Sequence, residues 1–252
     1  MIDYHLYVMA HGERPMTVEN ILEYYEVAHE RGIRQRGITE HDRYLEDIDL
    51  AAFQEAREMS QDVGLRLGIE IDFIPGNEDE MDRVATALPY DYVIGSVHRV
   101  DYAEVDHPAH MEIYEKWENY ELYEAYYENV RKAALSGRFD VIGHPDLIKI
   151  FRHFPDRDIT PMFEETADAV AEAGVVVDVN AAGLRKPIGE IYPARDFLEM
   201  FPRRGVPIIL SSDAHSAGEV AAGYKKSLKL VHDVGYREVV TFKDRERGTL
   251  SL

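Results

Sequence analysis

The stretch DYVIGSVH, residues 91–98, is a short apolar run that stops on a histidine, and the same pattern recurs along the chain. Comparable runs that stop on an imidazole or a carboxylate are IDYH (2–5), GITEH (37–41), LGIEID (67–72), VIGH (141–144) and IILSSDAH (208–215). Each is typical of a buried strand that carries a polar side chain at its C-terminal end. In a barrel of parallel strands these ends share one rim, which is where such folds place their active sites.

Strand-like and helix-like stretches alternate throughout, which predicts βα units and a parallel sheet or barrel. Strands are expected near 2–6, 36–40, 65–73, 91–97, 140–143, 175–180 and 207–211, with one more after about residue 236. Helices are expected near 17–31, 50–62, 78–87, 112–135, 159–173, 194–203 and 216–233. Strand ends at intervals of roughly thirty residues predict an α/β fold, a seven-stranded relative of the eight-stranded TIM barrel.

Composition excludes several classes of protein. The 252 residues contain no cysteine, so disulfides and thiolate metal sites are ruled out. The formal net charge of −20 disfavours binding of nucleic acid, which depends on basic side chains at phosphates. No apolar run reaches the ~18 residues of a membrane span, and the N-terminal residues lack the pattern of a secretory signal. We expect a single domain over residues 1–252, a cytoplasmic location and no membrane partner; the oligomeric state is undetermined.

The strand-end residues are types that bind metal ions. Asp213 and His215 in SSDAH are two residues apart, so on an extended strand end they point the same way. Glu70 lies in an apolar strand, where a carboxylate is costly unless it is paired or bound to a cation. Imidazoles at the other strand ends, and one in the loop after the first strand, complete the candidate ligand set. They are His5, His41, His98 and His144 at strand ends and His11 in the loop. Asp72 is expected to support these ligands or the fold. Converging imidazoles and carboxylates predict a multi-metal hydrolytic centre.

Together these residues resemble the polymerase-and-histidinol-phosphatase superfamily of metal-dependent phosphoesterases. Longer stretches are similar to the bacterial histidinol-phosphate phosphatases: YDYVIGSVH, DHPAH, FDVIGHPDLIKIF, DVNAAGLRKP and SSDAH, in this order. The resemblance implies a distorted (β/α)7 TIM-like barrel and two or three divalent ions of zinc, manganese or iron. It implies three ion sites: His5, Glu70 and Asp213; Glu70, His98 and His144; and His11, His41 and His215.

One residue departs from the family pattern. The pattern begins with histidine, any residue, histidine, and the second position here is Tyr7. A phenol, with a pKa of about 10, is a poor zinc ligand near neutral pH. The departure leaves the number of bound ions open, and with it the level of activity.

A small phosphorylated substrate also needs positive groups. Arg185 and Arg152 follow predicted strands, and by resemblance both would clamp the substrate phosphate, with Lys186 a weaker candidate. Glu70 is expected to bridge two ions, and Asp213 or water to protonate the leaving oxygen. Asp106 and His107, in the DHPAH segment, are candidates to contact a substrate amine.

The expected activity is hydrolysis of L-histidinol phosphate to L-histidinol and phosphate, in histidine biosynthesis. A phosphodiesterase or nucleotide phosphatase of the same superfamily is an alternative, as is a member with reduced activity. A metal-dependent amide or ring hydrolase fits less well, because Glu70 is the natural bridging ligand and the fourth strand ends in His98. A non-catalytic metal-binding module is the remaining alternative, supported by Tyr7 alone.

Overall fold

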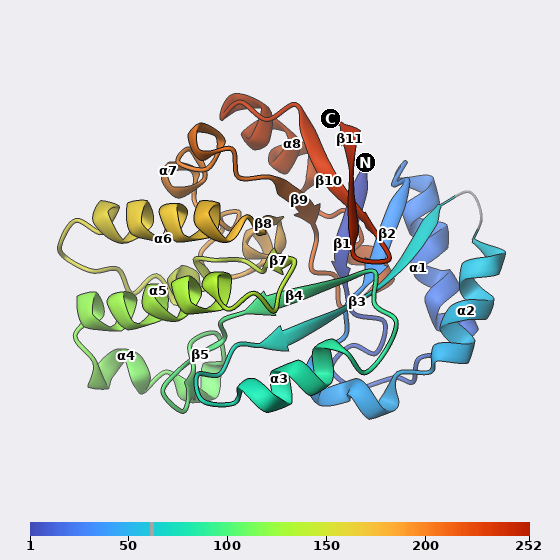
Figure 1. Cartoon of the computed structure of the whole chain (residues 1–252), viewed down its shortest axis with the longest axis horizontal. Coiled ribbons are helices and arrows are strands. Elements are labelled where there is room, and N and C mark those ends of the chain that lie inside the picture. Colours follow the sequence, from blue (N-terminus) through green and yellow to red (C-terminus); the bar gives the residue numbers. More distant parts are fainter. Residues whose placement is uncertain (61–62) are drawn as a thin grey trace.

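The computed structural model describes residues 1–60 and 63–252. Seven parallel strands pair in the order β1-β2-β3-β4-β7-β8-β9 and wind into a nearly closed barrel (Figure 1). These strands are β1 (Ile2–Leu6), β2 (Gln35–Ile38), β3 (Gly64–Asp72), β4 (Tyr92–Ser96), β7 (Val141–Ile142), β8 (Val176–Asn180) and β9 (Ile208–Ser211). The predicted seven-stranded α/β barrel is therefore confirmed.

The barrel closes where the first and last of these strands meet. Leu6 and Ala214 form a parallel bridge just beyond the end of β9. The Tyr7 amide donates to the Ala214 carbonyl at 2.9 Å, and the Ala214 amide donates to the His5 carbonyl at 3.3 Å. Because these bonds lie at the strand C-termini, His5 lies beside the Asp213–His215 segment.

Helices surround the barrel (Figure 1). They are α1 (Val18–Glu30), α2 (Leu50–Met59), α3 (Glu78–Ala85), α4 (Ile113–Lys116), α5 (Asn119–Leu135), α6 (Thr160–Ala173), α7 (Arg195–Leu198) and α8 (Tyr224–Asp233). Thr17 caps α1, since its hydroxyl accepts from the Asn20 amide at 3.2 Å. Gly174 ends α6 in the left-handed conformation, at a φ of 65° that glycine adopts without strain.

Four predicted helices differ from those observed. The stretch 112–135 divides into α4 and α5 because Trp117 is extended and the Glu118 carboxylate caps a new helix on the Tyr120 and Glu121 amides. The stretch 216–233 becomes regular only at Tyr224, and 194–203 contains only the short α7 before a 3₁₀ turn. The helix expected over 50–62 ends at Met59, and its last two positions lie outside the described residues.

The end of the barrel opposite the strand C-termini is filled by aromatic side chains. The strand expected after residue 236 is present as a hairpin of β10 (Glu238–Lys243) and β11 (Glu246–Ser251). Phe242 of β10 stacks on Tyr92, with 5.3 Å between ring centroids, and Tyr92 stacks on Tyr4 at 5.1 Å. Gly37 makes room for this stack, because a Cβ there would lie 1.7 Å from the Tyr92 hydroxyl. With this end packed, the opposite rim is free for a site.

A second small hairpin, β5 (Arg99–Val100) with β6 (Ala103–Glu104), follows β4 and overhangs the rim at the strand C-termini. Among the described residues, no helix has the length and apolar character needed to cross a membrane.

Candidate metal centre

Glu70 lies at the centre of the rim. It projects from β3, is fully buried, and is approached by histidines from four other strand ends. The nearest nitrogen–oxygen distances to its carboxylate are 2.7 Å from His41 Nδ1, 3.1 Å from His144 Nε2, 3.3 Å from His5 Nε2 and 3.6 Å from His98 Nε2. The structure therefore brings together histidines that are far apart in sequence around one carboxylate.

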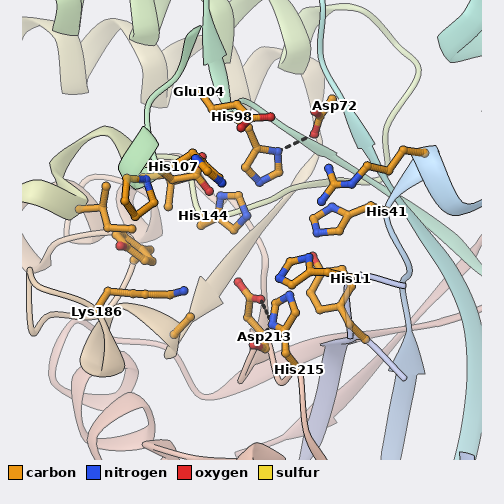
Figure 2. Close-up of a pocket in the computed structure, with 18 residues that line it drawn as sticks. His11, His41, Asp72, His98, Glu104, His107, His144, Lys186, Asp213 and His215 are labelled. Carbon is orange, nitrogen blue, oxygen red and sulfur yellow. Dashed lines mark hydrogen bonds and ion pairs between the residues drawn. The ribbon is translucent and has the colours of Figure 1, made fainter. Parts of the chain in front are cut away.

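A second group of imidazoles lies beside the first. His11, His41 and His215 each offer one ring nitrogen, and these three atoms lie within 4.8 Å of one another. In the first group, donor atoms of His5, Glu70 and His144 lie within 4.8 Å of one another in the same way. Figure 2 shows His11, His41 and His215 on one side of the cavity, with Asp213 next to His215. All eight predicted metal ligands thus lie at this rim, in the positions that the strand-end pattern predicts.

The backbone is unusual at three of these ligands. His11, His144 and Asp213 have φ angles of 61°, 21° and 52°, in or near the left-handed region that non-glycine residues seldom adopt. Such conformations cost free energy and concentrate at functional sites. The turns that aim these side chains into the cavity are therefore maintained against a local energetic cost.

The ligand atoms suit a divalent cation. Among residues 1–60 and 63–252, His41 Nε2, His144 Nδ1 and His215 Nε2 are buried and have no hydrogen-bond partner. Leaving a buried polar atom unpaired costs about 1–3 kcal/mol, which a bound cation would remove. A set of imidazole nitrogens and carboxylate oxygens without thiolate matches zinc, manganese or iron.

The electrostatics keep the carboxylates charged. Burial alone would raise the pKa of Glu70, but His98, His41 and His5 act against it, and its pKa falls well below its usual range. Burial likewise opposes ionisation of Asp213, yet His5 and His215 hold its pKa below normal. An ionised Asp213 can act as a metal ligand, and its role as proton donor stays a prediction.

Two imidazoles of the second group, His11 and His215, have lowered pKa values. Burial, followed by repulsion from His215 and His41, lowers the pKa of His11 to about 4. Burial also lowers the pKa of His215. Because only neutral imidazole can donate a lone pair to a metal ion, these shifts favour coordination at neutral pH.

Tyr7 stands between the two groups. Its hydroxyl lies 2.5 Å from Glu70 Oε2 and 2.6 Å from His5 Nε2, and its ring stacks on His41 and His215 at centroid distances of 4.6 and 4.2 Å. Burial and the charge of Glu70 raise its pKa well above the usual value. In the metal-free chain Tyr7 is therefore a neutral phenol that donates a hydrogen bond to the central carboxylate.

The cavity above the ligands has a volume of about 490 Å³. Its lining residues are Tyr7, His11, His41, Arg43, Asp72, His98, Glu104, Asp106, His107, Pro108, His144, Leu147, Ile150, Ala182, Lys186, Tyr192, Asp213 and His215. Asp72 accepts a hydrogen bond from His98 Nδ1 at 2.5 Å, which matches the supporting role expected for it. Asp106 and His107 line the cavity as predicted.

The two predicted phosphate clamps lie elsewhere. Arg185 donates to the carbonyls of Ser212 and Asp213, at 2.9 and 3.0 Å, and its Nε pairs with Glu219. Arg152 is exposed, and neither guanidinium belongs to the cavity lining. The cationic side chains that line it are Lys186, visible in Figure 2, and Arg43, which sequence reasoning missed. Arg43 follows the predicted ligand His41 by two positions, a signal that was available.

A third group, Glu104, His107 and His110, also has donor atoms within 4.8 Å of one another. Sequence reasoning did not foresee it, and its hydrogen bonds argue against a metal. The Nδ1 atoms of His107 and His110 accept from the backbone amides of Ala109 and Glu104, each at 3.1 Å. Neutral rings bonded in this way carry their proton on Nε2, so they are hydrogen-bond donors. Glu104 also pairs with Arg99.

Comparison with known proteins gives consistent matches. Residues 7–182 match the PHP domain family model. The chain is 42% identical over 191 residues to a "Probable histidinol-phosphatase" of Deinococcus radiodurans, covering 75% of this chain and 72% of the relative. It is 30% identical to the histidinol-phosphatase of Bacillus subtilis, covering 75% of each chain. The histidinol phosphate phosphatase of Lactococcus lactis, solved with zinc, L-histidinol and phosphate, superposes with a TM-score of 0.79 at 20% identity, over 98% of each chain.

Proposed function

Since the chain belongs to the PHP domain family, we propose that it is a metal-dependent phosphomonoesterase that hydrolyses L-histidinol phosphate to L-histidinol and phosphate, in histidine biosynthesis. Relatives at 42% and 30% identity carry the histidinol-phosphatase name. The structural observation that supports the proposal best is the group of four imidazoles around Glu70, at the base of a cavity. A cytoplasmic location and a single domain over residues 1–252 remain predictions.

Two or three divalent ions of zinc, manganese or iron would be held by the residues at the rim. The candidate ligands are His5, His11, His41, Glu70, His98, His144, Asp213 and His215. Such ions supply Lewis-acid chemistry, since they neutralise phosphoryl oxygens and activate water for in-line attack. Glu70 and Asp213 contribute charged oxygens that need no deprotonation at neutral pH.

Two cationic side chains in the cavity lining suit the phosphate. Lys186 and Arg43 line the cavity near the imidazoles, and the summed charge of the rest of the chain is strongly negative. A local positive field is therefore needed to draw in a phosphate dianion. The roles predicted for Arg152 and Arg185 at the phosphate stay predictions; the contacts of Arg185 support the Asp213 turn instead.

Other residues of the cavity suit the rest of the substrate. Glu104 and Asp106 contribute carboxylates to its lining, and His107 adds a donor; Figure 2 shows Glu104 next to His98. L-histidinol phosphate carries an ammonium group and an imidazole that can be protonated, which match acidic partners. Pro108, Leu147 and Ile150 provide apolar contacts for the ring. These acidic and apolar contacts would orient the substrate with its phosphate toward the imidazoles, Lys186 and Arg43.

The experiment is a comparison of phosphate release from L-histidinol phosphate, nucleoside monophosphates and a simple phosphodiester, with the chain supplied with manganese or zinc. The proposal predicts a kcat/KM for L-histidinol phosphate at least about 100-fold above the others, a difference of roughly 2.7 kcal/mol. Faster hydrolysis of a nucleotide or a diester would contradict the proposed substrate and indicate another activity of the family. Full metal occupancy without turnover of any ester would indicate a non-catalytic binding module.

A further inference from the structure

We propose that Asp178 is a positioning residue of the metal centre, which aims His5 directly and Asp213 through Asn180. The inference rests on the proposed metal-binding role of the rim, but it concerns a residue outside the candidate ligand set. Asp178 lies in the middle of β8, in the apolar sequence VVDVN, and is fully buried. A charged residue in such a strand is costly unless its oxygens are fully used.

The Asp178 carboxylate is held by three hydrogen bonds from three strands. His5 Nδ1 of β1 donates to Oδ2 at 2.9 Å, and Ser211 Oγ of β9 donates to Oδ1 at 2.6 Å. Asn180 Nδ2, two residues further along β8, donates to Oδ2 at 3.2 Å. Both oxygens therefore have partners, and their positions leave the carboxylate little freedom to rotate.

The bond to His5 decides which of its nitrogens faces the rim. Because Asp178 accepts from Nδ1, that nitrogen keeps its proton when a metal ion binds, and Nε2 is the nitrogen that supplies the lone pair. Nε2 lies 3.3 Å from Glu70 Oε1, on the side of the candidate metal ligands. A carboxylate behind an imidazole fixes the ring orientation and strengthens it as a ligand, and removing such a partner typically weakens metal binding.

Asn180 extends the same support to a second ligand. Its Nδ2 also donates to Asp213 Oδ2 at 3.0 Å, and its Oδ1 accepts from the Ala182 amide at 2.8 Å, which fixes the orientation of the amide. Asp213 needs such support because its own φ is 52°. One carboxylate in β8 thus connects ligands on the two strands, β1 and β9, between which the barrel closes.

The chain offers a matched control. Asp3 is equally buried and also accepts three hydrogen bonds, from the Ser212 amide, the Ser212 hydroxyl and the Ala221 amide, at 2.8, 2.6 and 2.8 Å. Among the described residues it forms no hydrogen bond or ion pair with an imidazole. Asp3→Asn therefore measures what losing a buried carboxylate does to the fold alone, whereas Asp178→Asn also removes the charge behind His5.

The test is metal affinity, measured by competition between the chain and a chromophoric chelator for zinc and for manganese. We expect Asp178→Asn to lower the affinity by about 10–100-fold and Asp3→Asn by less than about 3-fold, when both variants are compared with the unaltered chain. Equal affinities for Asp178→Asn and the unaltered chain would overturn the inference, as would equal losses in both variants. If the unaltered chain bound neither metal, the proposed metal centre itself would fail.

A measurement on the unaltered chain covers the case in which Asp178→Asn does not fold. Nitrogen-15 NMR of labelled histidines, with His5 assigned by its loss in His5→Gln, follows the two ring nitrogens during zinc addition. The inference predicts that Nδ1 keeps its proton while the Nε2 resonance shifts on binding. Zinc coordination through Nδ1 of His5 would overturn it.

Discussion

The Nδ1 atom of His41 lies 2.7 Å from Oε2 of Glu70, although His41 follows β2 and Glu70 lies in β3. They form an isolated parallel bridge that keeps the register of β2 and β3 three residues beyond the end of β2. The continued register places the two side chains in contact, and here the contact joins an imidazole to a carboxylate. The same relationship, repeated around the rim, produces the candidate metal centre.

His144→Ala should abolish most turnover while the fold is retained. The His144 ring contacts Glu70, and its other nitrogen has no hydrogen-bond partner among the described residues, so the main loss is one ligand. We expect turnover of L-histidinol phosphate to fall roughly 100-fold or more, and Asp213→Ala to behave alike. His29→Ala, on the exposed side of α1, is the control and should leave the rate unchanged. Unaltered turnover in His144→Ala would refute the ligand assignment.

Tyr7→His should raise the metal content or the activity of the purified chain. The phenol fills the space between His5 and Glu70 and bonds to both, whereas an imidazole in its place could donate a lone pair to an ion. The measurement is the number of metal ions per chain by elemental analysis, alongside phosphate release. Tyr7→Phe keeps the ring without a ligand atom and should not gain metal. No change in either property of Tyr7→His would mean that Tyr7 has another role.

The stability of the metal-free chain should depend on pH through Asp3. Burial raises the pKa of Asp3 from 3.8 to about 6, even though its hydrogen bonds favour the charged form. A folded-state pKa above the unfolded one gives stability that is fully present below pH 3.8 and is lost as the pH rises through about 6. Asp3→Asn cannot ionise, so its free energy of unfolding relative to the unaltered chain should rise over this interval. Chemical denaturation at several pH values tests this, and a constant difference would contradict it.

Gly37→Ala should destabilise the barrel by about 1–3 kcal/mol, as overpacking of a core does. The added Cβ would lie 1.7 Å from the Tyr92 hydroxyl, which donates to the Tyr4 carbonyl within the aromatic stack. Gly218→Ala is the matched control, since a Cβ there meets nothing within 4 Å, and its effect should stay within about 0.5 kcal/mol. Equal unfolding free energies for the two variants would argue against the described packing.

The parts of the site that could be predicted are those fixed by strand periodicity. A ligand at the end of a parallel strand needs only the strand and its register, so Glu70, His98 and His144 were placed correctly. Arg185 and Arg152 were expected at the phosphate, but neither lines the cavity. The direction of a long side chain in a loop depends on contacts such as those of Arg185 with Ser212 and Asp213, which the sequence does not reveal. Asp178 was missed, although a carboxylate within an apolar strand was the same signal that identified Glu70.

The proposed activity depends most directly on metal ions at the Glu70 rim that support hydrolysis. The decisive measurement is phosphate release from L-histidinol phosphate by the purified chain, with elemental analysis of bound metal, before chelation, after chelation and after manganese or zinc is restored. We expect metal at two or three ions per chain, loss of phosphate release when it is removed, and recovery when it is returned. Undiminished phosphate release by a chain shown to be free of metal would contradict the central claim.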